Sequence, residues 1–209
     1  MRKLRHFFVF LILATLFGCS TLTETPPAKT MVTPTSKGPT LYTAKGCFSS
    51  MLNLAQRWSP DAMPFHMESE VNADATGQEG KATVWRAFFA SRSRGTMKTV
   101  SCSGSRLPTS PALGFSDTPE MAYAANVPEA IFNPTSFQTD SDKAYTVTLE
   151  HGGAPLIKKD PQQPILYLLD WDAKRKLLLW SVIYGKSHTD RQGFCVVDAK
   201  TGAFNSAGK

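Results

Sequence analysis

The chain has 209 residues, enough for one ordinary domain or two small ones beside its terminal segments. Hydrophobic residues make up 42% of it, which is sufficient for a core. The net charge is +6, from 23 basic and 17 acidic residues, and removing Arg2, Lys3 and Arg5 with a leader would leave 20 basic residues and a net charge of +3. So small an excess of basic over acidic residues, with no clustered basic face, argues against nucleic-acid binding.

The first residues have the pattern of an export signal. Arg2 to Arg5 is basic, and Phe7 to Phe17 is an apolar run too short to span a bilayer. The run ends in Leu16-Phe17-Gly18-Cys19, which resembles the lipobox of bacterial lipoproteins. The resemblance implies that residues 1–18 are removed and that the Cys19 thiol takes a diacylglyceryl group. An ordinary secretory signal with an incidental Cys is the alternative.

Two further inferences concern the region after Cys19. Ser20 stands where Asp would indicate retention in the inner membrane, so the lipoprotein rule implies the outer membrane, facing the periplasm. Residues 19–40 are rich in Thr and Pro and have no apolar periodicity. They are predicted to form a disordered tether between the lipid and a folded domain.

Residues 41–104 are predicted to form a helix and three antiparallel strands. Apolar residues recur at helical spacing from Ala44 to Trp58, and Thr43 is a suitable N-cap. Strands are expected at 64–71, 82–90 and 97–102, where β-forming residues are dense. The polar segment 72–80 is expected to be a long hairpin loop.

Residues 105–139 are predicted to be a linker with a short helix over Glu120 to Ala125, and residues 140–209 a second unit. Its strands are expected at 165–171, 177–184 and 194–197. Its first segment is ambiguous, because 145–149 alternates like a strand whereas Gly152-Gly153 is typical of a helix stop. The place of this segment ahead of three strands, as in the first unit, favours a helix.

The two units share an ordered pattern that indicates duplication. Trp85 to Ala90 aligns with Trp180 to Gly185, each a Trp, four residues ending in an aromatic one, and a small residue. Pro64 and Pro164 begin the preceding strands. The predicted fold class is therefore α+β, with two repeats of a helix plus a three-stranded antiparallel meander and the helices packed on one face of the sheet. Two unrelated αβ units rich in aromatic residues are the alternative.

The second unit resembles the PepSY-like repeat. The resemblance rests on Ser141 to Gly153, Trp180 to Gly185 and Val197 to Gly202. The first unit resembles the repeat only in its general pattern, because it has no counterpart of the motif from Val197 to Gly202. Tandem units of this kind look like the architecture of β-lactamase-inhibitor proteins. The resemblance implies an envelope or secreted domain that binds or inhibits rather than catalyses, with Asp198 bonding to the backbone of the turn at Thr201-Gly202.

Three cysteines remain after Cys19, in a compartment that is expected to be oxidising. Cys47 lies on the inner side of the predicted helix and Cys102 on a strand of the same unit. A disulfide between them is expected to join helix to sheet. Cys195, between Phe194 and Val196, is then expected to be a buried free thiol.

The candidate catalytic and metal-binding residues are few and scattered. Cys195 with His188 or His151 is the sharpest enzyme hypothesis, but no third residue is placed to orient the imidazole. His66, His151 and His188 have no metal-ligand spacing. Asp170 and Asp172 are interpreted as a turn pair. The sequence therefore predicts no catalytic site, metal or cofactor.

Together these observations predict a non-catalytic, lipid-anchored envelope protein that acts as a binding or interaction module facing the periplasm. The expected contacts are the membrane, through the lipid on Cys19, and a protein or cell-wall partner. The alternative is an inhibitor or folding partner of a secreted hydrolase.

Overall fold

The computed structural model of the protein describes residues 38–208, so the predicted signal peptide, Cys19 and most of the predicted tether lie outside the described residues. The helices are α1 (Ala44–Trp58), α2 (Val127–Ala130), α3 (Ser141–Thr148) and α4 (Ala154–Lys159), with helical turns at Gln78–Gly80 (η1), Pro134–Ser136 (η2) and Leu149–Gly153 (η3). The strands are β1 (Met63–Ser69), β2 (Val84–Ser91), β3 (Thr96–Ser103), β4 (Gly114–Asp117), β5 (Met121–Ala122), β6 (Ile165–Asp172), β7 (Leu177–Gly185), β8 (Arg191–Asp198) and β9 (Phe204–Gly208).

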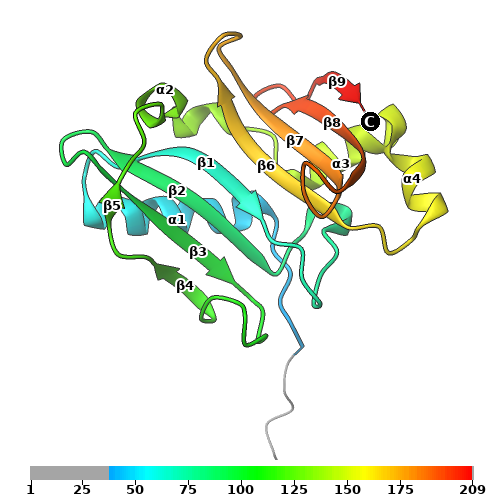
Figure 1. The fold of residues 1–209 in the computed structure, drawn as a ribbon, viewed down its shortest axis with the longest axis horizontal. Helices are drawn as coiled ribbons and strands as arrows, with labels where there is room; N and C mark the ends of the chain where they lie inside the picture. The colour runs from blue at the N-terminus through cyan, green and yellow to red at the C-terminus, as the bar shows by residue number, and fades with distance from the viewer. Residues whose placement is uncertain (1–37, 209) are drawn as a thin grey trace, which may run out of the picture. The chain divides into compact units, whose positions relative to one another are not determined.

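All of these strands belong to one antiparallel sheet, as the predicted α+β class requires (Figure 1). The strand order is β4-β3-β2-β1-β6-β7-β8-β9, with β5 paired to β3 beside β4. The meanders β1-β2-β3 and β6-β7-β8 therefore meet at their first strands. The β1–β6 pair is short: His66 pairs with Asp170, Met67 with Leu169 and Glu68 with Leu168.

The predicted first helix is confirmed, and its sequence explains its position. The Thr43 side chain accepts a hydrogen bond from the Gly46 backbone N–H, which satisfies one of the free donors of the first turn. The buried residues recur along one side of α1: Ala44, Cys47, Phe48, Met51 and Ala55. This side packs on β1, β2 and β3. The second predicted helix also forms, as α3, with Asp140 as its N-cap.

The core lies between the helices and the sheet, around two tryptophans at equivalent places in the two meanders. The Trp85 indole N–H donates to the Tyr42 carbonyl at 2.8 Å, and the Trp180 indole N–H donates to the Thr139 carbonyl at 2.9 Å. Each carbonyl directly precedes the N-cap of a helix, α1 or α3. The two rings meet edge to face, with 6.2 Å between centroids, so the cores of both halves are continuous.

The predicted short helix over Glu120 to Ala125 is wrong. Met121 and Ala122 form β5, which pairs with Met97 and Thr96 of β3, and the helix α2 comes later. The outer edge of β3 offers unpaired backbone groups, and pairing with them satisfies this segment better than an isolated helical turn would.

The predicted helix stop at Gly152-Gly153 is confirmed, but a second helix follows it directly. His151 and Gly152 leave helical conformation, with Gly152 at φ +109°, and α4 begins at Ala154. Gly153 is needed for packing, because a Cβ there would lie 1.8 Å from the Tyr184 hydroxyl oxygen.

The predicted turn at Thr201-Gly202 is confirmed, since Asp198 Oδ1 accepts from the backbone N–H groups of Lys200 and Thr201.

Cys47 and Cys102 are joined by a disulfide with an S–S distance of 2.03 Å, the pairing expected from the sequence. The bond ties α1 to β3, next to the edge where β4 is added. Cys195 is a free, buried thiol on β8. The first meander is therefore covalently attached to its helix, whereas α3 is held over β7 and β8 by packing and hydrogen bonds.

Replacing Cys47 and Cys102 together by Ser is expected to lower the free energy of unfolding by about 2–4 kcal/mol, because the bond closes a long loop in the unfolded chain. Urea denaturation measures the loss, with Cys195→Ala as the control that leaves the disulfide intact. Non-reducing digestion should yield one linked peptide pair containing Cys47 and Cys102. A pair joining Cys102 to Cys195, or three free thiols, would contradict the assignment.

Candidate functional site

The two faces of the sheet differ in what covers them. Side chains alternate along a strand, and the register extends this alternation across the sheet. Trp85, Met67 and Trp180 point toward the helices and belong to the buried core. The side chains between them point the other way, to the face opposite α1 and α3. Figure 1 shows α1 and α3 behind the sheet and this face toward the viewer.

We call this second surface the open face. Three rows of paired residues cross it: Phe88–His66–Asp170–Leu179, Arg86–Glu68–Leu168–Ser181–Val196 and Leu166–Ile183–Phe194. Phe88, Leu166 and Phe194 are partly exposed, whereas Leu168, Leu179, Ile183 and Val196 are buried. Partly exposed aromatic and aliphatic side chains beside an Arg are typical of the composition of protein–protein interfaces.

A cluster of three polar residues lies on the open face at the junction of β1 and β6. His66 Nδ1 lies 2.6 Å from Asp170 Oδ1, and His66 Nε2 lies 3.4 Å from Glu68 Oε2. Burial alone lowers the pKa of His66, but the hydrogen bonds and charges of the two carboxylates outweigh it and raise the pKa to about 9. The imidazole is therefore charged at neutral pH and has no free nitrogen to act as a base.

A cleft of about 640 Å³ lies beside this cluster. Its polar wall contains Glu68, Glu70 and Arg86, and its apolar wall contains Leu166 and Pro164. The Arg86 guanidinium forms an ion pair with Glu70. The lining also includes Val71 from the first unit and Lys186 from the second, so a partner seated in the cleft would contact both halves of the sheet.

The residues of the Cys–His hypothesis lie close together but are not arranged for catalysis. The Cys195 thiol donates to the His151 carbonyl oxygen at 3.4 Å, whereas the His151 ring stacks on Phe204, with 3.9 Å between centroids. Burial raises the pKa of the Cys195 thiol, opposite to what a nucleophilic thiolate requires. Within residues 38–208, no hydrogen bond joins the His188 ring to this thiol.

The two aspartates of the predicted turn pair have separate contacts. Asp170 binds His66, whereas Asp172 accepts from Arg175 Nε at 2.7 Å and from the Arg175 backbone N–H. In the described part of the chain, no group of three His, Cys, Asp or Glu side chains is placed to hold a metal ion.

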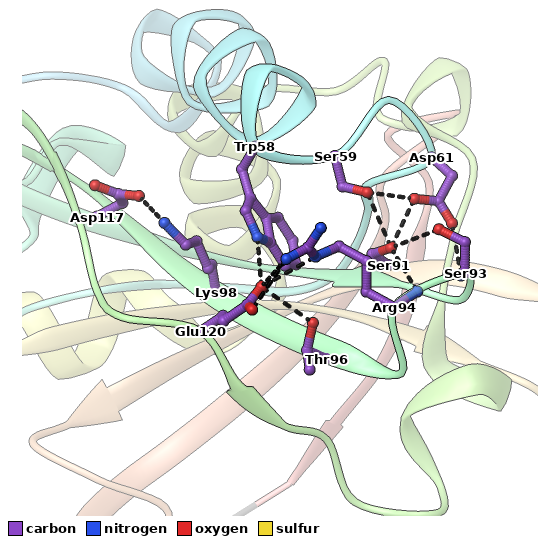
Figure 2. Close-up of polar contacts among 10 residues, drawn as sticks. All are labelled: Trp58, Ser59, Asp61, Ser91, Ser93, Arg94, Thr96, Lys98, Asp117 and Glu120. Carbon is purple, nitrogen blue, oxygen red and sulfur yellow. Dashed lines mark hydrogen bonds and ion pairs between the residues drawn. The ribbon is translucent and has the colours of Figure 1, made fainter.

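A second polar cluster closes the far edge of the first meander (Figure 2). Glu120 accepts from the Trp58 indole N–H at 2.7 Å and from the Arg94 guanidinium at 3.0 Å, while Lys98 pairs with Asp117 at 2.5 Å. Arg94 and Lys98 also lie over the Trp58 ring. Because these groups satisfy one another, we interpret the cluster as a clamp that holds β4 and β5 against β3.

The sequence analysis considered His66 and Asp170 separately and missed their pairing. They are 104 residues apart, and only the alignment of β1 with β6 brings them together. The alternation within each strand indicates which residues share a face, but nothing in either strand specifies its partner.

Comparison with known proteins gives one structural likeness. No protein-family model matches the chain, and no curated protein is similar to it in sequence. The fold is similar to the crystal structure of a candidate lipoprotein from Clostridium difficile 630, with a TM-score of 0.50 over 82% of this chain and 93% of that chain. The two sequences are 12% identical, so the likeness concerns the fold alone. The PepSY-like resemblance stays a prediction.

None of the helices in residues 38–208 is long and apolar enough to cross a membrane.

The His66 cluster predicts a loss of stability at alkaline pH. The pKa of His66 is about 9 in the folded chain and 6.5 ordinarily, so its contribution is complete below pH 6.5 and is lost as the pH rises through 9. The expected loss in free energy of unfolding is about 2 kcal/mol. It is smaller than the full pKa shift of His66 would give, because the Asp170 side chain is half exposed and solvent screens the pair. Urea denaturation between pH 6 and 10 should show this decline in the wild type and a flatter profile in His66→Gln. Parallel profiles would contradict the assignment.

Proposed function

We propose that this protein is a lipid-anchored, non-catalytic binding module of the bacterial cell envelope, whose open face receives a macromolecular partner. The observation on which the proposal rests is the arrangement of the sheet. One face is filled by helices, and the other presents partly exposed apolar side chains, a charged cluster and a cleft across the junction of two meanders.

Three observations support an envelope location. The Leu16-Phe17-Gly18-Cys19 motif follows a basic and then an apolar segment, as in lipoprotein signals. A disulfide between Cys47 and Cys102 suits an oxidising compartment outside the cytoplasm. The C. difficile protein of similar fold is itself described as a candidate lipoprotein, which agrees with anchoring through Cys19. Placement in the outer membrane rests on Ser20 alone.

We also infer that the two meanders arose by duplication of one PepSY-like unit. The strand order is symmetric about the β1–β6 junction, since β3-β2-β1 on one side corresponds to β8-β7-β6 on the other. Trp85 and Trp180 make the same indole hydrogen bond to the residue before a helix N-cap. A duplicated unit explains why the open face has its cleft where the copies meet.

A macromolecule suits the open face better than a small substrate. Its partly exposed side chains extend from Phe88 on β2 to Phe194 on β8, across five neighbouring strands. Small-molecule sites are enclosed, with a few convergent polar groups, whereas specific protein partners cover broad surfaces of mixed polarity. The polar groups here are paired with one another, so they would orient a partner at the rim of a contact rather than act on a substrate.

Anchoring is tested by substituting the modified residue. Cys19→Ser is expected to abolish acyl labelling and to leave the signal segment uncleaved, because the lipid-bearing cysteine is the residue exposed by cleavage. Metabolic labelling with a fatty acid and the mass of the purified chain measure both changes, with Cys195→Ser as the matched control. Unchanged labelling of Cys19→Ser would contradict the proposal.

The binding face is tested with a photo-crosslinking side chain placed at one position at a time in cells. We expect discrete adducts from Leu166 and Ser181, on the open face, and none from Lys143, which is exposed on α3. The identity of the partner separates the alternatives: a secreted hydrolase would indicate an inhibitor or folding partner. Equal adducts from Lys143, or none from the open face, would contradict the assignment of the surface.

A further inference from the structure

We propose that the segment Pro111–Phe115, together with Leu41, docks the folded domain onto the lipid surface that holds its anchor. This inference rests on the proposed lipidation of Cys19, and it assigns a second role to an edge of the sheet remote from the β1–β6 junction. The docked element is an apolar loop and edge strand that lies beside the point where the chain enters the domain.

The exposed apolar side chains are not spread evenly. Within residues 38–208, the large hydrophobic side chains that are exposed are Leu41 (49%), Leu113 (49%), Phe115 (47%) and Met121 (54%). Isolated exposed apolar residues are ordinary, but a group of them at one place marks an interaction site. Three of these four lie at the same end of β3.

The backbone pairing places Leu41 and Leu113 on either side of that strand end. The Thr40 N–H donates to the Gly104 carbonyl at 3.0 Å on one side of the chain, and Gly114 pairs with Ser103 on the other. Figure 1 shows the start of the described chain and the loop between β3 and β4 at the same end of the molecule. The end of the domain to which the tether is attached therefore bears this apolar group.

The local sequence suits contact with lipid. Pro111-Ala112-Leu113-Gly114-Phe115 contains no charged residue, and its last two residues begin β4, the terminal strand of the described sheet. Arg106, in the same loop, is exposed and forms no ion pair with any residue described here. A loop that carries both apolar side chains and an exposed guanidinium suits the boundary between acyl chains and phosphate headgroups.

Two acidic groups lie near this segment: Asp74, which accepts a hydrogen bond from the Ser105 hydroxyl at 2.6 Å, and Asp117. Asp117, which ends β4, pairs with Lys98 at 2.5 Å, so its charge is compensated within the domain. The clamp around Glu120 in Figure 2 fixes the same edge from the other end and keeps β4 on the sheet. Gly114 and Phe115 are thus held on the sheet as part of β4, and Pro111 to Leu113 lead into that strand.

The anchor favours a lipid surface over other occupants. The chain from Cys19 to Gly38 extends to at most about 65 Å, so the domain stays within that distance of the bilayer. Tethering of this kind gives an effective concentration in the millimolar range, at which a weak apolar contact is occupied. A second copy pairing through β4 would gain only a four-residue ladder, too short to hold a dimer by itself.

The test uses the lipidated full chain in vesicles of phosphatidylethanolamine and phosphatidylglycerol with brominated acyl chains, which quench tryptophan on contact. Phe115→Trp is expected to show at least twofold more quenching above the wild-type background than Met121→Trp, the matched exposed position. Adding Leu113→Ser to Phe115→Trp should lower that quenching. Both changes are at exposed positions, so the fold is expected to survive, and circular dichroism checks it.

Each outcome bears on a different claim. Equal quenching at positions 115 and 121, in protein whose mass includes the lipid, would overturn the docking surface and leave the proposed anchoring standing. A chain whose mass lacks the lipid and that washes off the vesicles would overturn both. Quenching at 115 that persists unchanged in Leu113→Ser would also contradict the shared apolar segment.

Discussion

The structure depends on one short contact, the antiparallel pairing of β1 with β6. Three residue pairs join the meanders there, and the charged His66 between Asp170 and Glu68 adds a polar link on the open face. On the helix side, the same junction is covered by the edge-to-face rings of Trp85, Trp180 and Tyr167. A three-stranded meander with one helix buries little apolar surface by itself. When the two meanders pair edge to edge, they share one core, and each loses one free sheet edge.

The junction also determines where function can reside. Because α1 and α3 lie on the same side, we propose the other side of the sheet as the surface for a partner. The cleft at Glu68, Arg86 and Leu166 exists because the two meanders meet there. The thiol of Cys195 is instead buried and donates to the His151 carbonyl, and the exposed imidazole of His151 stacks on Phe204.

Local features of the fold were predictable, and contacts between distant segments were not. The helix from Ala44, its Thr43 cap and the strand positions follow from spacing and turn residues. The Cys47–Cys102 pairing follows from placing one Cys on a helix and one on a strand of the same unit. The edge strands β4, β5 and β9 were missed, because short exposed strands have little apolar periodicity and form where an edge is available. The open face was missed because the order of strands is not encoded within any single strand.

The central claim is that a partner covers the open face in the cell envelope. Hydroxyl-radical footprinting on isolated native membranes, compared with the protein released in mild detergent and purified, measures this directly at single side chains. Oxidation of Phe88, Leu166 and Phe194 is predicted to fall on the membranes, while that of Tyr145 and Val147, partly exposed on α3, is predicted to be unchanged. Equal oxidation of the open face in both samples, or protection confined to the helix side, would contradict it.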